Sequence, residues 1–318
     1  MDQRVSDDPL NIADRLARVL HLRNGRRLGY AEYGAPDGQP VMALHGTPGA
    51  RTMFAVADQA ARAKGIRIIA PDRAGYGLSE AHHFDTLADT AGDIEALADW
   101  LGLDRFTLAG YSGGAPHALA AALLMGDRIE RVALISPVGL VAEGAHVPMT
   151  GVQHFIFSYL GNSQFAARMY FHSVRSMIAW LPGGAKMLVT QYASESDRAI
   201  LRQPGLRELL DLTMHEGLGT SVDGAVQDLR LYCRPWGLPL HELEAPAHIW
   251  QGAADTIVAP EAAYQLAKAL PNCTLEVLQD MGHYWLFGAF EGILETIREK
   301  PRQEFAPKTG LRTWFGVS

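Results

Sequence analysis

The sequence predicts an α/β fold in which a mostly parallel sheet carries helices on both faces. Short apolar runs alternate with longer helical segments along most of the chain, and this order is typical of parallel strands joined by helices. Several of these runs end directly in turns rich in Gly or polar residues. Because right-handed crossovers bring the carboxyl ends of such strands to one edge, these turns should share a rim where ligands bind.

Short apolar runs mark the expected strands. Two of them, at 18–22 and 27–33, flank Asn24-Gly25, which favours a tight β-hairpin turn. The other strands are expected at 41–44, 66–70, 106–109, 132–135, 247–250 and 274–278.

Helices are expected between these strands. Residues 86–101 repeat apolar side chains at a helical period, and Thr86 with Asp89 resembles a capping box. The other helices are expected at 52–64, 115–125, 260–270 and 285–300.

The alternation of strand and helix breaks after Pro137. Residues 138–244 contain no clear strand, and their apolar and aromatic residues recur at helical spacing. We therefore expect a helical cap, or lid, inserted into one α/β core. The expected division is a core at 17–137 and 245–300, a cap at 138–244, and terminal extensions at 1–16 and 301–318.

Composition and charge narrow the function classes. The formal net charge is -7, from 28 Lys+Arg against 35 Asp+Glu, whereas nucleic-acid binding needs a basic surface. No apolar run approaches the roughly eighteen residues of a membrane span, and the polar residues 1–8 show no secretory signal. Cys233 and Cys273 follow no metal or redox spacing. We expect a cytoplasmic protein with reduced thiols.

The turn between 106–109 and 115–125 carries the pattern Gly110-x-Ser112-x-Gly114. A sharp strand-to-helix turn requires glycines where the backbone approaches closely, and it lifts the serine hydroxyl clear of the sheet. Small residues are common in turns, so the pattern alone also fits a structural β-α turn. The nucleophile reading of Ser112 depends on partners elsewhere in the chain.

Two such partners follow strands and so belong to the same rim. Asp255 comes after the strand at 247–250, and His283 comes after the strand at 274–278. His283 Nε2 would take the serine proton, and Asp255 would orient the ring and stabilise the imidazolium. Their structural alternatives are a packed loop histidine and a carboxylate that caps a helix or forms a salt bridge.

Acyl transfer also needs hydrogen-bond donors for the oxyanion. The backbone N–H of Gly113 lies at a helix N-terminus, where a developing anion is favoured. A second N–H is expected from Thr47 in the tight loop His45-Gly46-Thr47-Pro48-Gly49, which His45 should brace.

Five motifs taken together resemble the lid-bearing branch of the α/β-hydrolase superfamily. They are HGTPG at 45–49, PDRAGYGLS at 71–79, GYSGG at 110–114, GAAD at 252–255 and MGH at 281–283. The resemblance implies an eight-stranded, mostly parallel sheet, a cap after the sixth strand, a Ser-Asp-His triad and no cofactor. The loop at 45–49 is similar to that of proline iminopeptidases and related esterases.

The residues beside Ser112 depart from several branches of that superfamily. Proline iminopeptidases usually carry Trp directly after the serine and C–C bond hydrolases usually carry Met there, whereas this chain has Gly113, preceded by Tyr111. Epoxide hydrolases and dehalogenases need a nucleophilic Asp at the position of Ser112. These departures disfavour peptide, C–C and epoxide substrates.

The sequence thus predicts a serine hydrolase that cleaves a small-molecule carboxylic ester, with small to medium apolar groups, through an acyl-enzyme on Ser112. Aminopeptidase, amidase or lactonase activity on the same triad is one alternative. A lyase or cofactor-free oxygenase is another, and a non-catalytic receptor or scaffold is a third. An aminopeptidase would need cap carboxylates to bind the substrate ammonium, and the candidates are Glu195, Asp197, Glu208, Asp211 and Glu216.

Aromatic residues are candidates for the substrate pocket. They are Tyr111 beside the serine, and Phe155, Tyr159, Phe171 and Trp180 in the cap; the alternative is that they hold the cap together. His82 and His83 lack further ligand residues in register, so no metal site is expected. The Trp314-Phe315 pair in the tail could dock on a second copy, as in a homodimer, or on its own fold.

Overall fold

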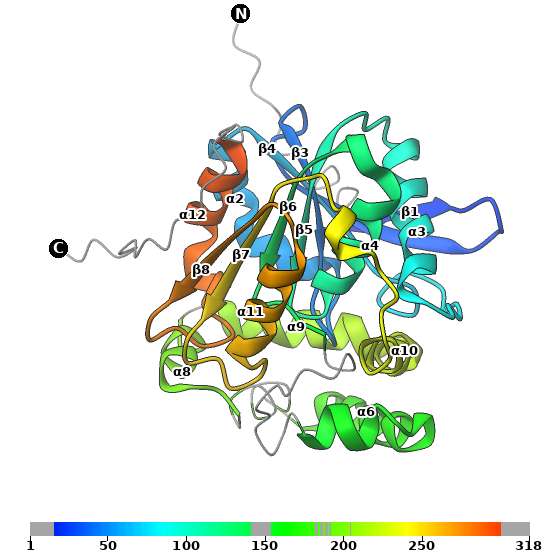
Figure 1. The fold of residues 1–318 in the computed structure, drawn as a ribbon. Helices are drawn as coiled ribbons and strands as arrows, with labels where there is room; N and C mark the ends of the chain where they lie inside the picture. Colours follow the sequence, from blue (N-terminus) through cyan, green and yellow to red (C-terminus); the bar gives the residue numbers. More distant parts are fainter. Residues whose placement is uncertain are drawn as a thin grey trace, which may run out of the picture.

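A central sheet organises the molecule, with helices on both of its faces (Figure 1). The computed structural model describes residues 16–140, 154–181, 192–203 and 205–299, together with Gly184, Met187 and Thr190. Its sheet has eight strands and is mostly parallel, so the predicted fold class is confirmed.

The strands run in the order β1-β2-β4-β3-β5-β6-β7-β8 across the sheet. Their bounds are β1 (Arg18–His21), β2 (Arg27–Gly34), β3 (Gln39–Leu44), β4 (Ile66–Pro71), β5 (Phe106–Tyr111), β6 (Ile129–Ile135), β7 (Ala247–Gly252) and β8 (Cys273–Leu278). The pairs β1–β2 and β2–β4 are antiparallel, and all other neighbours are parallel. The carboxyl ends of β3 to β8 therefore lie at one edge, as the sequence predicted.

Two apolar layers sandwich the sheet. One contains α3 (Leu87–Trp100), α4 (Gly114–Met125) and α11 (Pro260–Ala269). The other contains η1 (Arg51–Ala57), α2 (Asp58–Ala63) and α12 (Leu286–Arg298). Thr86 caps α3 in a capping box with Asp89, as expected. The single helix expected at 52–64 is instead a 3-10 helix, η1, followed by the short α2.

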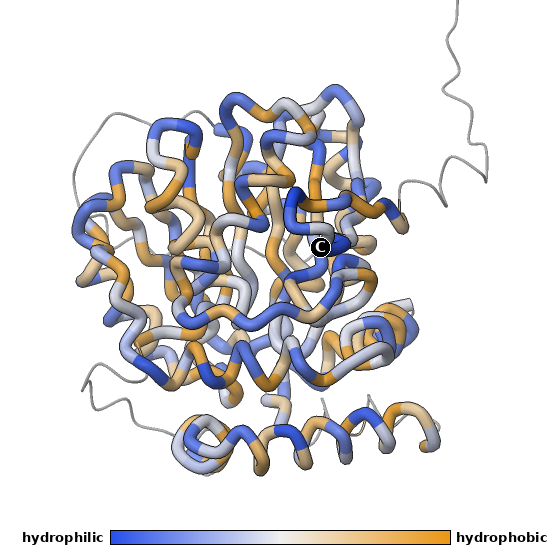
Figure 2. Tube along the Cα trace, turned by 90° about the vertical axis from the view of Figure 1, so that its right-hand side faces the viewer, coloured by the Kyte–Doolittle hydropathy of each residue, from blue (hydrophilic) through white to orange (hydrophobic). Residues whose placement is uncertain are grey.

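Between β6 and β7 the described residues form helices and no strand. They are η3 (Phe155–Leu160, a π-helix), α6 (Gln164–Trp180), α8 (Glu195–Ile200), α9 (Leu206–Gly219), α10 (Asp223–Tyr232) and η4 (Leu240–Glu242). The first five lie beyond the carboxyl edge of the sheet (Figure 1). Of these, α6 is outermost and mixes hydrophobic with hydrophilic residues along its length (Figure 2). A third apolar cluster joins α6 to α9 and α10.

Some predictions fall outside what the structure describes. The N-terminal extension lies there except for Leu16, and the tail at 301–318 lies there entirely. The domain bounds at 138 and 244 stay predictions. None of the helices in the described ranges has the length and apolarity needed to cross a membrane.

Candidate active site

Ser112 occupies the turn between β5 and α4. Its φ is +51°, a left-handed backbone conformation that a non-glycine residue seldom adopts. A Cβ atom on Gly110 would come 2.6 Å from Ala115 Cα, and one on Gly114 would come 2.2 Å from the Leu44 carbonyl oxygen. The two glycines therefore allow the close approach that the turn requires, and the serine is presented at its apex.

The structure brings the three predicted triad residues together. His283 Nε2 lies 3.1 Å from Ser112 Oγ, and His283 Nδ1 lies 2.8 Å from Asp255 Oδ2. All three residues are buried, with Ser112 8% exposed. Since the Asp255 carboxylate can only accept, Nδ1 carries the proton and Nε2 is left to accept from the serine hydroxyl.

The Asp255 carboxylate is itself held by backbone and side-chain donors. Its Oδ1 accepts from the N–H groups of Ile257 and Val258 at 2.9 and 2.8 Å. Its Oδ2 also accepts from Gln251 Nε2 at 3.1 Å. This set of bonds fixes the plane of the carboxylate and therefore the orientation of the His283 ring.

Tyr111 lies directly under the histidine. Its hydroxyl donates to the His283 carbonyl oxygen at 3.2 Å, and its ring centroid lies 5.3 Å from the imidazole. Burial, with the nearby Tyr284 and Asp255, raises the pKa of Tyr111 well above its usual value. The hydroxyl thus stays protonated as a donor, so Tyr111 supports the base.

Thr47 and Gly113 are neighbours beside Ser112. A Cβ atom on Gly113 would come only 2.4 Å from Thr47 Oγ1. Neither backbone N–H donates a hydrogen bond to another described residue. Both N–H groups therefore lack a partner among the described residues, and their role as an oxyanion hole stays a prediction.

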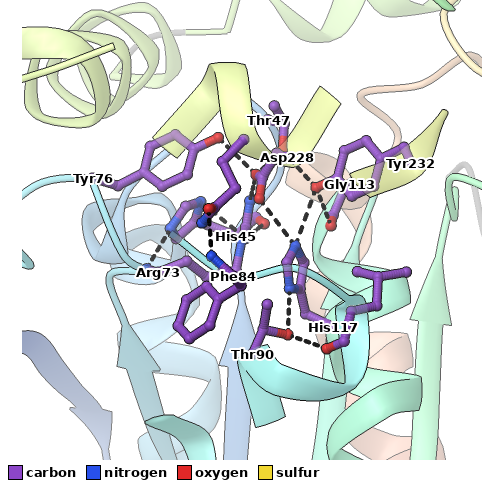
Figure 3. A network of polar contacts seen from close by, with 12 residues as sticks. His45, Thr47, Arg73, Tyr76, Phe84, Thr90, Gly113, His117, Asp228 and Tyr232 are labelled. Carbon is purple, nitrogen blue, oxygen red and sulfur yellow. Dashed lines mark hydrogen bonds and ion pairs between the residues drawn. The ribbon is translucent and has the colours of Figure 1, made fainter. Parts of the chain in front are cut away.

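A buried cluster of polar residues lies behind this pair (Figure 3). Its centre is Asp228 of α10, whose Oδ2 accepts from Thr47 Oγ1, Arg73 Nη2 and Tyr76 OH, each at 2.6 Å. Its Oδ1 lies 3.0 Å from His117 Nε2. Burial alone would raise the pKa of Asp228, but the Arg73 guanidinium and His117 hold it well below the usual range. Asp228 is therefore a buried anion.

His45 braces the same loop from the core side. Its Nδ1 lies 2.8 Å from the Gly46 carbonyl oxygen, and its Nε2 accepts from the Arg73 N–H at 3.1 Å. Burial, and then the Arg73 charge, lower the pKa of His45 well below its usual value. The ring is thus neutral and both of its nitrogens are engaged in holding the loop.

A second cap carboxylate holds the loop that carries His283. Asp197 of α8 accepts from the backbone N–H groups of His283 at 2.9 Å and Tyr284 at 2.7 Å. It also closes a capping box with Ser194. A Cβ atom on Gly282 would come 2.1 Å from Asp197 Oδ2, so glycine is needed in this loop.

Sequence reasoning missed the roles of Asp228, Tyr232 and Asp197. The sequence offers one weak sign for the first two. Asp228 is a carboxylate among the mostly apolar buried positions of α10, where Arg230 is the other charged residue, and Tyr232 lies one helical turn later. Nothing near Asp197 in the sequence points to His283.

The predicted pocket aromatics are scattered. Phe171 is buried in the apolar cluster of the cap, whereas Phe155 and Tyr159 stack on each other and are largely exposed. Trp180 is 86% exposed. Only Tyr111 of the five has a described contact with the triad, and the pocket role of the others stays a prediction.

Metal and thiol chemistry find little support in the described ranges. No group of three or more His, Cys, Asp or Glu residues there is arranged to hold a metal ion. Cys233 and Cys273 are free thiols, and burial raises the pKa of each to about 12. Neither thiol is therefore a competing nucleophile at neutral pH.

Comparison with known proteins gives one family and several distant relatives. The family model for the alpha/beta hydrolase fold matches residues 39–289. The chain is 28% identical over 291 residues to Epoxide hydrolase A of Mycobacterium tuberculosis, an alignment that covers 83% of this chain and 90% of that protein. It is 25% identical over 280 residues to 2-hydroxy-6-oxononadienedioate/2-hydroxy-6-oxononatrienedioate hydrolase 2 of Pseudomonas putida, covering 86% of this chain and 90% of that protein.

A solved structure shares the fold. The esterase EaEST from Exiguobacterium antarcticum superposes with a TM-score of 0.67 at 20% identity, over 88% of this chain and 97% of that chain. At this sequence identity, the similarity is evidence for a shared fold and not for a shared substrate.

Proposed function

The chain belongs to the α/β-hydrolase fold family, and on that premise we propose that it is a serine hydrolase which cleaves a carboxylic ester through an acyl-enzyme on Ser112. The single observation that supports this most is the pair of contacts around His283, 3.1 Å to Ser112 Oγ and 2.8 Å to Asp255 Oδ2. A nucleophile, a base and a group that orients the base are in hydrogen-bond reach of one another.

The first half of the proposed reaction forms the acyl-enzyme. Ser112 Oγ attacks the ester carbonyl carbon while its proton moves to His283 Nε2, and Asp255 stabilises the resulting imidazolium. The carbonyl oxygen becomes an oxyanion, which the N–H groups of Thr47 and Gly113 bind. Collapse breaks the bond to the leaving alkoxide, which takes the proton from His283 and departs as the alcohol.

The second half regenerates the serine. A water molecule gives a proton to His283 Nε2 and its oxygen attacks the acyl carbon. The same N–H groups of Thr47 and Gly113 bind the second oxyanion. The bond to Ser112 Oγ then breaks, the oxygen recovers its proton from His283, and the carboxylic acid is released.

The aminopeptidase alternative is weakened by what the cap carboxylates already bind. Asp197 accepts two backbone N–H groups, and Glu216 pairs with Arg51 at 2.7 Å. Asp211 lies 3.9 Å from Arg207, and Glu195 and Glu208 are exposed. None of the five is both buried and free to bind a substrate ammonium.

Two relatives of this chain are named epoxide hydrolases. Opening an epoxide with a carboxylate nucleophile gives an ester, which water can then cleave. Attack by the Ser112 oxygen would instead give an ether, which has no carbonyl carbon for water to attack. The enzyme would be trapped after one turnover, so a serine at this position favours acyl transfer.

A panel of nitrophenyl esters of increasing acyl length, run beside a proline arylamide, tests the proposal. We expect ester turnover with a preference among short to medium chains, abolished by Ser112→Ala and retained by the matched control Ser173→Ala, since Ser173 is exposed on α6. Undiminished ester turnover in Ser112→Ala would contradict the mechanism. Faster arylamide cleavage would favour a peptidase, and absence of turnover and of serine labelling would favour a receptor.

A further inference from the structure

The last helix of the cap, α10, reaches the two oxyanion-hole candidates. We propose that Asp228 and Tyr232 are positioning residues, which hold Thr47 and Gly113 in place so that the cap helps to build the oxyanion hole as well as to cover it. This inference rests on the proposed function, because it concerns the anion formed on the acyl carbon.

Asp228 contacts Thr47, and Tyr232 contacts both Thr47 and Gly113. Thr47 Oγ1 donates to Asp228 Oδ2 at 2.6 Å. The Tyr232 hydroxyl donates to the Gly113 carbonyl oxygen at 2.6 Å and lies 2.9 Å from Thr47 Oγ1. Asp228 and Tyr232 are one turn apart on α10, so one face of this helix contacts both Thr47 and Gly113 (Figure 3).

The Asp228 carboxylate is itself held in a fixed position by several donors. Arg73 and Tyr76 donate to the same carboxylate oxygen that receives the Thr47 hydroxyl, and His117 contacts the other oxygen. Arg73 Nη2 also donates to Thr47 Oγ1 at 3.0 Å. With donors on both oxygens, the carboxylate has little freedom to rotate, and its position is set by the core as well as by α10.

Holding these residues matters because an oxyanion hole acts by preorganisation. A donor that is already fixed costs no reorganisation when the anion forms, and loss of one such donor typically lowers kcat by about 10²- to 10³-fold. The hydroxyl of Thr47 and the carbonyl of Gly113 are hydrogen-bonded to the cap, while the N–H groups of the same residues bond to none of the residues that the structure describes. Loosening these hydrogen bonds should weaken anion binding without changing which groups contact the substrate.

If the cluster had only a structural role, substitutions in it would lower the free energy of unfolding and leave kcat unchanged. Removing the Asp228 carboxylate would strand a buried guanidinium and risk unfolding, so two smaller deletions are preferable. Thr47→Val removes a hydroxyl but keeps the backbone N–H and the side-chain volume. Tyr232→Phe removes only the hydroxyl that binds Gly113.

The matched control is Thr52→Val. Thr52 is also buried at the contact between core and cap, and its hydroxyl lies 3.3 Å from Thr213 Oγ1 of α9. The control thus loses one hydroxyl contact between core and cap, and in the described part of the chain that hydroxyl forms no hydrogen bond with Thr47 or Gly113.

The readouts are kcat and KM for a nitrophenyl ester and the rate at which a fluorophosphonate labels Ser112. In labelling, Ser112 Oγ attacks phosphorus while its proton moves to His283 Nε2, and the P–F bond breaks to release fluoride. The P=O oxygen gains negative charge during the attack and enters the same anion site. We expect Thr47→Val and Tyr232→Phe to lower kcat and the labelling rate in parallel by about 10- to 100-fold, a part of the loss of a whole donor. KM should stay within about twofold, since uniform substrate binding is untouched.

The outcomes separate the inference from the proposed function. Unchanged kcat and labelling rates in both variants, with activity abolished by Ser112→Ala, would overturn the positioning role alone. An equal loss in Thr52→Val would also overturn it, because the effect would then be a general loosening of the cap. Absence of Ser112 labelling in the native chain would overturn both.

Discussion

Gly113 shows how much of this site is decided by the absence of a side chain. The space where a Cβ atom would lie is already filled by Thr47 Oγ1 at 2.4 Å and Tyr232 OH at 2.6 Å. This chain has Gly113 after the serine, where the C–C hydrolases and proline iminopeptidases that it resembles usually carry Met or Trp. The structure supplies a physical reason, since a larger residue would displace both of these hydroxyl groups.

Gly113→Ala is expected to lower kcat for a nitrophenyl ester at least tenfold, because the new methyl group must push Thr47 or Tyr232 out of place. Gly92→Ala is the control. Gly92 is exposed within α3 and its Cβ would meet nothing within 4 Å, so helix propensity should make that variant up to about 1 kcal/mol more stable with unchanged kcat. Full activity in Gly113→Ala would show that this crowding is tolerated.

Residue-level prediction from the sequence was possible where a short motif marks the position. Ser112, Asp255 and His283 each follow a strand in a recognisable turn, and the structure brings the three together. Asp228 and Tyr232 lie 181 and 185 residues from Thr47 along the chain. No local pattern reports a contact at that separation, since α10 reads as an ordinary amphipathic helix.

At the scale of elements, two cap helices each present a buried carboxylate to the rim. Asp228 of α10 faces the loop after β3, and Asp197 of α8 faces the loop after β8. The strands were predictable because each is a short apolar run bounded by turns. The cap was predictable only as a helical region, because helical spacing alone does not say which face packs against which loop.

The Asp197→Asn substitution should loosen the loop that carries His283. An amide oxygen is a weaker acceptor than a carboxylate and would serve the two backbone N–H groups poorly, so we expect a loss of about 1–3 kcal/mol in the free energy of unfolding. A lower kcat should accompany it as the histidine becomes less ordered. Urea unfolding and ester kinetics measure the two effects.

Glu195→Gln provides the comparison on the same helix. Glu195 lies in the first turn of α8 like Asp197 but is exposed, and so should change stability by less than about 0.5 kcal/mol. Similar losses in the two variants would mean that α8 as a whole, rather than the Asp197 carboxylate, supports the loop.

At the scale of the whole molecule, the parallel sheet gathers the functional loops and the buried polar cluster joins them to the cap. The buried polar cluster contains histidines in their neutral form. His45 is fully buried, with the Arg73 charge and the Tyr76 ring against it, and its pKa is well below the usual value. Burial lowers the pKa of His117 in the same direction.

Folding stability should therefore fall as the pH drops below about 6.5. The unfolded chain takes up a proton on each of these histidines near that pH, whereas the folded chain does not until a lower pH, so protonation favours unfolding. Each group contributes a slope of up to about 1.4 kcal/mol per pH unit. Urea unfolding between pH 5.5 and 7.5 measures the slope.

His45→Gln should make that slope shallower, although His117 continues to contribute. His82→Gln, at an exposed position, should leave the slope unchanged. A slope that is identical in the native chain and His45→Gln would show that His45 does not resist protonation in the folded state.

A nitrophenyl dimethylcarbamate tests whether Ser112 forms a covalent acyl intermediate, because a carbamoyl-enzyme hydrolyses slowly. We expect a stoichiometric burst of nitrophenolate, a matching increase in the intact mass, and an adduct that maps to the peptide containing Ser112. Ser112→Ala should show neither burst nor adduct. A burst of the same size in Ser112→Ala, or an adduct on a different residue, would show that Ser112 is not the nucleophile.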